Sequence, residues 1–274
     1  MNANPQKALL STLTSHRGHY GIDGGWRAVA SLSWAAGGGL LLFTFALFSE
    51  ISKPLFQRAL EFLGGAFLLQ VPASFFYSTL RGKFVVWAEL LMSLSLRGDE
   101  RVLDMGCGRG AILGMLGKLL PKGRAVGLDL WRTEDQSGNS LASARANVEA
   151  EGVTDRCELQ TGDMRSLPFP NADFDLVVSN LAIHNISEGE GRKRAVDEAV
   201  RVLKPGGQLL IADLFRTEEY FQWLQEAGML GVSTESLGWR FGYGVLGVTP
   251  RLVRARKPNG EEPPPEGTPS AHAP

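Results

Sequence analysis

A glycine-rich segment, Arg101–Gly110 (RVLDMGCGRG), carries the clearest chemical signal in the chain. A short apolar run leads into three glycines, and a helical pattern begins near Ala111. Glycines let the backbone turn tightly and approach a ligand closely, as nucleotide-binding loops require. Because Gly106, Gly108 and Ala111 also fit the dinucleotide pattern G-x-G-x-x-G/A, an NAD-dependent oxidoreductase is one interpretation.

Asp104 stands two residues before the first glycine and separates two interpretations of the loop. A carboxylate at this position would repel a pyrophosphate, whereas it would attract the cationic amino-acid end of S-adenosyl-L-methionine (SAM). Asp104 therefore favours a sulfonium cofactor over a dinucleotide.

The loop resembles motif I, D-x-G-C-G-x-G, of the class I SAM-dependent methyltransferases, with matches at Asp104, Gly106, Cys107, Gly108 and Gly110. Further resemblances follow in the family's order over residues 98–256, and this order is more specific than any single motif. They include the L-K-P-G-G turn and strand within Leu203–Asp213, which is a structural segment.

The resemblance assigns cofactor contacts along the chain. Asp129 ends an apolar strand and would accept hydrogen bonds from the ribose hydroxyls of SAM. Leu130 and Trp131 would cover the adenine face; the alternative for Trp131 is a side chain that fills the core. Asp163 and Met164 match the acid and neighbour that read the adenine edge; the alternative for Asp163 is a helix N-cap.

Asn180 and His184 follow the apolar strand Phe174–Asn180. Ligands of open α/β sheets bind at the carboxyl ends of the strands, so both residues are expected to border the active-site crevice. His184 is the best candidate for a general base if the acceptor carries a proton. The alternative is a histidine whose hydrogen bonds are satisfied by the backbone.

Other candidate residues carry weaker signals, and no metal site is predicted. The weaker base candidates are Asp135, His16, His19 and Tyr243. The pair His16-x-x-His19 has no further ligands near it in sequence. The polar insert 132–139 is longer than most α/β loops; it could line the crevice, while Asn139 or Ser140 could cap the helix after it.

Composition limits the classes of partner and environment. A formal net charge of −1 without a basic stripe argues against nucleic acid and favours a small-molecule acceptor. The only two cysteines, Cys107 and Cys157, suggest neither a disulfide framework nor a zinc site, which fits a reducing environment. Oligomeric state cannot be read from these features.

Two uncharged runs, residues 28–49 and 62–80, predict an N-terminal helical hairpin. Each would reach about 30 Å, the thickness of a bilayer core, so both are predicted transmembrane helices. The alternative is a soluble helical subdomain; a signal peptide is disfavoured because the first run is late and long. Basic residues outside the hairpin favour cytoplasmic termini, and they are Arg17, Arg27, Arg81 and Lys83, against Lys53 and Arg58 in the connector.

The predicted fold class is α/β: a Rossmann-like, seven-stranded, mostly parallel sheet with helices on both faces, preceded by the helical hairpin. The resemblance supplies the strand number, and alternating strand and helix patterns support the class. We expect an N-terminal segment over 1–81, a methyltransferase domain over 82–257 that starts with an amphipathic helix at 82–96, and a disordered tail over 258–274.

The sequence therefore predicts a membrane-bound SAM-dependent methyltransferase whose catalytic domain lies on the cytoplasmic side. The expected acceptor is small and hydrophobic, such as a lipid, a quinone-like molecule or an apolar thiol, and the aromatic segment Gly238–Tyr243 could line its pocket. The alternatives are a non-catalytic membrane-bound SAM-binding module and, with less support, the NAD-dependent oxidoreductase.

Overall fold

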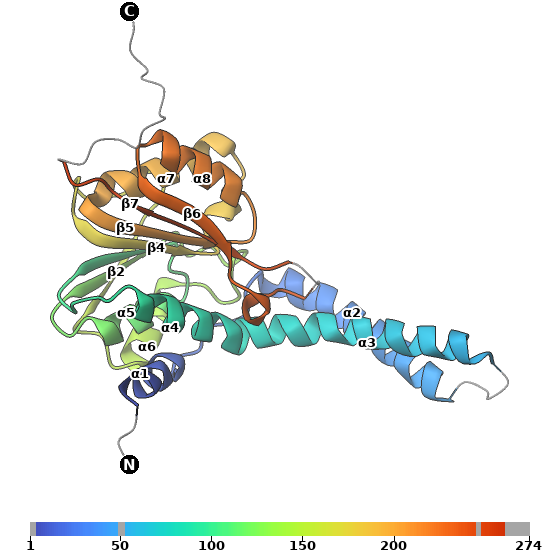
Figure 1. The fold of residues 1–274 in the computed structure, drawn as a ribbon. Coiled ribbons are helices and arrows are strands. Elements are labelled where there is room, and N and C mark those ends of the chain that lie inside the picture. Colours follow the sequence, from blue (N-terminus) through green and yellow to red (C-terminus); the bar gives the residue numbers. More distant parts are fainter. Residues whose placement is uncertain (1–3, 49–52, 245–247, 261–274) are drawn as a thin grey trace, which may run out of the picture.

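The computed structural model describes residues 4–48, 53–244 and 248–260. Its centre is a seven-stranded sheet in the order β3-β2-β1-β4-β5-β7-β6 (Figure 1). The strands are β1 (Arg101–Met105), β2 (Arg124–Asp129), β3 (Cys157–Thr161), β4 (Phe174–Asn180), β5 (Leu203–Asp213), β6 (Leu230–Ser236) and β7 (Arg251–Arg256). β7 alone runs opposite to the other six strands, so the predicted mostly parallel sheet is confirmed.

Helices cover both faces of this sheet, as Figure 1 shows. One face packs against α1 (Pro5–Thr14), α4 (Lys83–Ser93), α5 (Ala111–Leu119) and α6 (Leu141–Ala150), and the other against α7 (Gly189–Val202) and α8 (Thr217–Glu226). Side chains alternate along a strand, so Val102 joins the first core and Leu103 the second. Burial on both faces explains the near-continuous apolar sequence of β4.

Loops at the carboxyl ends of β1 and β2 lead into the helices α5 and α6. Gly110 precedes α5 with a φ of 80°, a conformation that favours glycine. Ser140 caps α6, since its hydroxyl accepts a hydrogen bond from the Ser143 backbone N–H at 3.1 Å. Two short 3₁₀ helices complete the domain, η2 (Ile183–Asn185) and η3 (Trp239–Phe241).

A long helical arm projects away from the domain (Figure 1). It consists of α2 (Gly25–Phe48) and α3 (Leu55–Tyr77), so the expected pair of apolar helices is present. Helix α3 begins seven residues before the predicted run, directly after Pro54, which cannot continue a helix on its N-terminal side. Within this added segment Glu61 pairs with Lys53 at 3.0 Å.

The two arm helices lie in close contact at a pair of glycines, Gly39 and Gly65. A Cβ placed on Gly65 would lie 2.8 Å from the Phe43 backbone nitrogen and 3.0 Å from the Gly39 carbonyl oxygen. Small residues at such points let helix backbones pack tightly, as in membrane helix pairs.

A single π-helical turn, η1 (Ser78–Gly82), joins α3 to α4 without an interruption. The predicted amphipathic helix at 82–96 is therefore the inner end of one continuous helix. Gly82 lies against the Arg240 carbonyl of η3 so closely that an added Cβ would be 1.6 Å from that oxygen. The hydroxyls of Ser74 and Ser78 both donate to the Gly242 carbonyl. These contacts fasten the base of the arm to the domain.

The C-terminal tail predicted from Pro258 lies, from residue 261 onwards, outside the described residues.

Candidate active site

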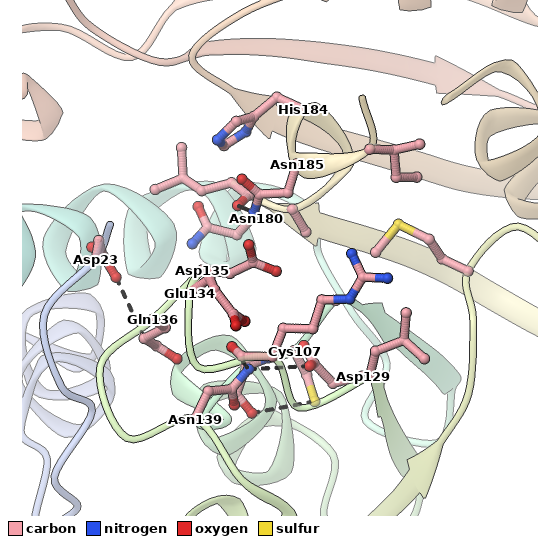
Figure 2. Close-up of a pocket in the computed structure, with 18 of the residues that line it drawn as sticks. Asp23, Cys107, Asp129, Glu134, Asp135, Gln136, Asn139, Asn180, His184 and Asn185 are labelled. Carbon is pink, nitrogen blue, oxygen red and sulfur yellow. Dashed lines mark hydrogen bonds between the residues drawn. The ribbon is translucent and has the colours of Figure 1, made fainter. Parts of the chain in front are cut away.

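A cavity of about 410 Å³ opens at the carboxyl ends of β1, β2 and β4. Figure 2 shows its side chains converging from loops that are distant in sequence. Ten sequence-predicted site residues line it: Asp104, Gly106, Cys107, Gly108, Asp129, Leu130, Asp163, Met164, Asn180 and His184. Two others, Gly110 and Trp131, lie outside its lining.

The glycine loop forms the floor of the cavity. Gly106 has a φ of 77°, and an added Cβ would approach the Ala182 Cβ to 2.3 Å. At Gly108 an added Cβ would lie 2.6 Å from the Gln136 side-chain oxygen. Glycine is therefore required at Gly106 by conformation and by space, and it is favoured at Gly108 by a φ of 51°, as expected for a loop that holds a ligand against its backbone.

Asp104 is a buried carboxylate, with 1% of its surface exposed, that lines this floor. Neither carboxylate oxygen has a hydrogen-bond partner among the described residues. Burial raises the pKa of Asp104 to about 7, and the neighbouring charge of Asp129 adds to the rise. An unpartnered buried carboxylate facing a cavity fits a cationic ligand group such as the SAM ammonium.

Asp129 lies at the end of β2, where it ties two loops together. One carboxylate oxygen accepts from the Gly108 N–H at 2.8 Å, and the other accepts from the Trp131 N–H at 2.6 Å. The Asn139 side chain adds a third donor at 3.2 Å. A carboxylate has about four acceptor positions, so Asp129 keeps capacity for a ribose hydroxyl.

The chain turns sharply after Leu130, so that only one of the two neighbouring residues predicted to cover the adenine lines the cavity. Leu130 lines the cavity, whereas Trp131 has a φ of 60° and its indole N–H donates to the Thr161 hydroxyl at 2.7 Å. The backbone reversal directs the indole toward β3. Trp131 is half-buried and belongs to neither core cluster, so it does not fill the core either.

Asp163 and Met164 both reach the cavity from the loop after β3. The Asp163 carboxylate accepts from the backbone and the guanidinium of Arg165, at 2.6 Å for the shortest contact. The Arg165 guanidinium holds the pKa of Asp163 below its usual value. Asp163 begins none of the described helices, so the alternative role as an N-cap does not apply.

Asn180 and His184 stand at the end of β4 and in η2. The Asn180 side-chain oxygen accepts from the indole N–H of Trp87 at 2.7 Å, which links β4 to the fully buried face of α4. His184 contacts the carboxylate of Asp213 at the end of β5 through both its backbone N–H and its ring Nδ1. The histidine is therefore held by a side chain as well as by the local turn.

The polar insert after β2 forms one wall of the cavity, to which it contributes Arg132, Glu134, Asp135, Gln136 and Asn139. Burial raises the pKa of Asp135. The segment between α1 and α2 pairs with this insert: Ser137 donates to the Ile22 carbonyl, and Gly24 donates to the Asp135 carbonyl.

The sequence did not reveal a cluster at the base of the arm. Asp23 lines the cavity and accepts from the Lys83 ammonium at 2.9 Å and from the Tyr243 hydroxyl at 2.8 Å. Lys83 is 1% exposed, and Phe75 of α3 packs edge-on against Tyr243. The sequence marks Lys83 only as one of the basic residues that flank the hairpin, and no spacing pattern points to Asp23 or Phe75.

His16 and His19 lie outside the cavity lining, and His16 stacks on Phe84 with 4.2 Å between ring centroids. Within the described ranges, no group of three or more potential ligands could hold a metal ion.

The lining is strongly acidic. It contains three basic residues, Lys83, Arg132 and Arg165, against seven carboxylates: Asp23, Asp104, Asp129, Glu134, Asp135, Asp163 and Glu188. Such a field attracts a cationic ligand and repels a pyrophosphate.

Comparison with known proteins agrees with this geometry. Residues 102–207 match the family model described as a methyltransferase domain. A ubiquinone/menaquinone biosynthesis C-methyltransferase, UbiE, of Roseobacter denitrificans is 33% identical over 129 residues, which are 47% of this chain and 48% of that protein. The sterol 4-C-methyltransferase strm-1 of Caenorhabditis elegans is 30% identical over 127 residues, which are 46% of this chain and 35% of that protein. The chain thus spans at most about half the length of these relatives.

These matches support a class I methyltransferase domain with S-adenosyl-L-methionine as its cofactor.

Solved structures show the same fold. The [4+2]-cyclase SpnF superposes with a TM-score of 0.51 at 21% identity, covering 63% of this chain and 82% of its own. A methyltransferase from a complex with the Haloferax volcanii activator Trm112 gives a TM-score of 0.51 at 20% identity, covering 65% of this chain and 91% of its own. One of the two is named for a cyclisation, so the fold alone does not define the reaction.

Proposed function

We propose that this protein is a SAM-dependent methyltransferase that transfers a methyl group to a small hydrophobic acceptor at a membrane. The observation that carries the proposal is the unpartnered, buried carboxylate of Asp104 on the floor of an acidic cavity. An ionised group in this position is costly without a cationic partner, and SAM supplies one.

The residues of the cavity divide into roles toward the cofactor. Asp104 would pair with its ammonium group, and Asp129 would accept from its ribose hydroxyls. The glycine loop, through Gly106, Cys107, Gly108 and the helix start at Gly110, would shape the floor beneath it. Leu130, Met164 and Asp163 would surround the adenine, whereas Trp131 would act only through its backbone N–H on Asp129.

When bound, SAM supplies an electrophilic methyl group whose leaving group needs no acid. The protein then contributes proximity, orientation and exclusion of water. Asn180, held by Trp87, and His184, held by Asp213, form the part of the cavity wall that we assign to the acceptor. His184 is the candidate base for an acceptor that carries a proton.

We further propose that the arm inserts into a membrane, with the catalytic domain on the cytoplasmic side, where SAM is available. By length and composition, Val29–Phe48 and the continuous helix from Leu55 could each cross a bilayer. Among the described residues, sixteen of the twenty large exposed hydrophobic side chains lie between Trp34 and Leu80, which concentrates apolar surface on the arm. Arg81 and Arg240 at its base match the preference for basic residues on the cytoplasmic side.

The arm and the cavity meet at Phe75 and Tyr243, which supports a hydrophobic acceptor that reaches the site from the bilayer. The similarity to proteins named as quinone and sterol methyltransferases points to the same chemical class. A non-catalytic SAM-binding module remains the second candidate, because binding and turnover share the residues of the floor. The acidic lining disfavours the NAD-dependent oxidoreductase.

The deciding experiment uses SAM with a labelled methyl group, the detergent-solubilised full chain and an organic extract of host membranes. Label in extractable lipid supports the proposal. SAM binding by calorimetry without label transfer favours the binding module, and absence of SAM binding refutes both. For the arm, the protein should stay with membranes after a carbonate wash; its release into the soluble fraction would make the arm a soluble subdomain.

A further inference from the structure

The contacts of His184 support an inference about the acceptor that rests on the proposed function. His184 lines the cavity from η2, and Asp213 ends β5 beside it. The His184 backbone N–H donates to one Asp213 oxygen at 3.1 Å, and the ring Nδ1 makes a short contact with the other. Asp213 is only 1% exposed, so this pairing is shielded from water.

The Asp213 carboxylate is itself fixed by two further donors. The Leu214 N–H donates to one oxygen at 2.9 Å, and the Tyr220 hydroxyl donates to the other at 3.2 Å. Burial and the adjacent Asp213 charge raise the pKa of Tyr220, which keeps its hydroxyl protonated and donating. A carboxylate held in this way accepts a hydrogen bond from Nδ1–H, which leaves the lone pair of the ring on Nε2.

We infer that Asp213 is a positioning residue that holds His184 as a general base for an acceptor that must lose a proton, and that this acceptor is a weakly acidic hydroxyl compound, a phenol or an enol. The acceptor hydroxyl gives its proton to His184 Nε2, and its oxygen forms a bond to the methyl carbon. The carbon–sulfur bond breaks with its electron pair left on sulfur, and Asp213 stabilises the imidazolium.

The same proton removal serves attack through a ring carbon conjugated with the hydroxyl. In that case the carbon loses its hydrogen as a proton while the oxygen regains one, so one proton is released in total. An acceptor that reacts as a neutral amine or thioether needs no base, and a buried carboxylate behind His184 would then contribute nothing to the rate.

Other charged groups near His184 affect how the rate of methyl transfer depends on pH. Asp135, from the loop after β2, interacts electrostatically with His184. Arg192 of α7 pairs with Glu219 at 3.0 Å and donates to the carbonyl of Ile186, which directly follows η2. The test therefore compares variants at each pH rather than relying on one absolute titration.

The experiment measures label transfer from SAM into extractable lipid by the detergent-solubilised full chain, with His184→Gln and Asp213→Asn as variants. Asp197→Asn on the exposed face of α7 is the matched control. At pH 7 both variants should lose about 10²- to 10⁴-fold in rate, the usual contribution of a general base. SAM affinity, measured by calorimetry, should stay within threefold of wild type.

At pH 10 a phenol ionises without assistance, so the deficits of both variants should shrink below tenfold. Rates within threefold of wild type at pH 7, or equal deficits at pH 7 and 10, would overturn the inference. If Asp213→Asn loses SAM binding, Asp213→Glu decides instead: failure of this retained carboxylate to restore rate over Asp213→Asn contradicts a positioning role. Wild-type protein that transfers no label defeats the proposed function first, and this inference with it.

Discussion

Replacing Asp104 with asparagine should make the free protein more stable and SAM binding weaker. Burial raises the pKa of Asp104 from 3.8 to about 7, so the folded protein resists ionising this group. A rise of about three pKa units corresponds to about 4 kcal/mol of destabilisation above pH 7. The buried amide in the variant would lack partners, at a cost of about 1–3 kcal/mol.

The net gain for Asp104→Asn at pH 8 is therefore about 1–3 kcal/mol, or a melting temperature several degrees higher. Between pH 4 and pH 7 the folded state binds the extra proton, so the stability contributed by wild-type Asp104 falls as pH rises through this window. The advantage of the variant should consequently shrink as the pH falls from 8 to 5.

Bound SAM should favour the wild type over the variant, because its ammonium group would stabilise the ionised carboxylate of Asp104. Asp104→Asn should bind SAM more weakly by about 1.5–3 kcal/mol, the range for hydrogen bonds to charged groups. At pH 6 wild-type protein should release up to about one proton on binding SAM, and the variant none.

Thermal melts of the solubilised protein at pH 5 and 8 test the predicted difference in stability between the wild type and Asp104→Asn. Calorimetry in buffers of different ionisation enthalpy tests the predicted SAM affinity and proton release. Asp155→Asn, an exposed substitution outside the cavity, is the control. A stability difference independent of pH, or SAM affinity equal to that of wild type, would refute the assignment of Asp104 as the buried partner of the cofactor.

Three further substitutions test separate contacts. Asp129→Ala should weaken SAM binding by about 1–3 kcal/mol in calorimetry, and unchanged binding would remove Asp129 from the site. Gly106→Val should abolish SAM binding, because an added Cβ would already lie 2.3 Å from Ala182; retained affinity would show that the loop is loose. Gly65→Leu should separate the arm helices and increase proteolysis of the arm, whereas Gly64→Leu, with open space around it, should not; equal effects would contradict the packing at Gly39.

Much of the fold follows from local pattern. The β4 sequence is apolar along its length because both faces of the strand are buried. This pattern can be recognised without knowing which strands lie beside it. Ser140 caps α6 through a contact three residues away, which sequence spacing encodes directly. The family resemblance supplied the strand number, which no local pattern contains.

Prediction from the sequence fails where one backbone angle or one distant contact determines where a side chain lies. Trp131 follows Leu130 in sequence, yet a positive φ turns its indole to Thr161 and away from the cavity lining. Helix α3 begins at Leu55, directly after Pro54, whereas the uncharged run that predicted it begins only at residue 62, beyond Arg58 and Glu61.

The candidate site shows the same division. Asp104 is predictable because it stands two residues before the first glycine of the loop, and Asp129 because it ends an apolar strand that the family resemblance assigns to the ribose. Asp23, Lys83 and Tyr243 are separated by up to 220 residues and meet only after the arm has docked on the domain. No pattern within one segment relates these three residues, so the sequence alone could not place them together.

The uninterrupted helix from Leu55 to Ser93 restricts how the length of the arm can change during evolution. Each residue inserted into α3 would add about 1.5 Å and rotate everything beyond it by about 100°. The facing helix α2 would need a matching insertion to keep the Gly39–Gly65 contact. Viable lengths should therefore differ by nearly whole turns, added in pairs, so related arms should fall into discrete size classes rather than vary continuously.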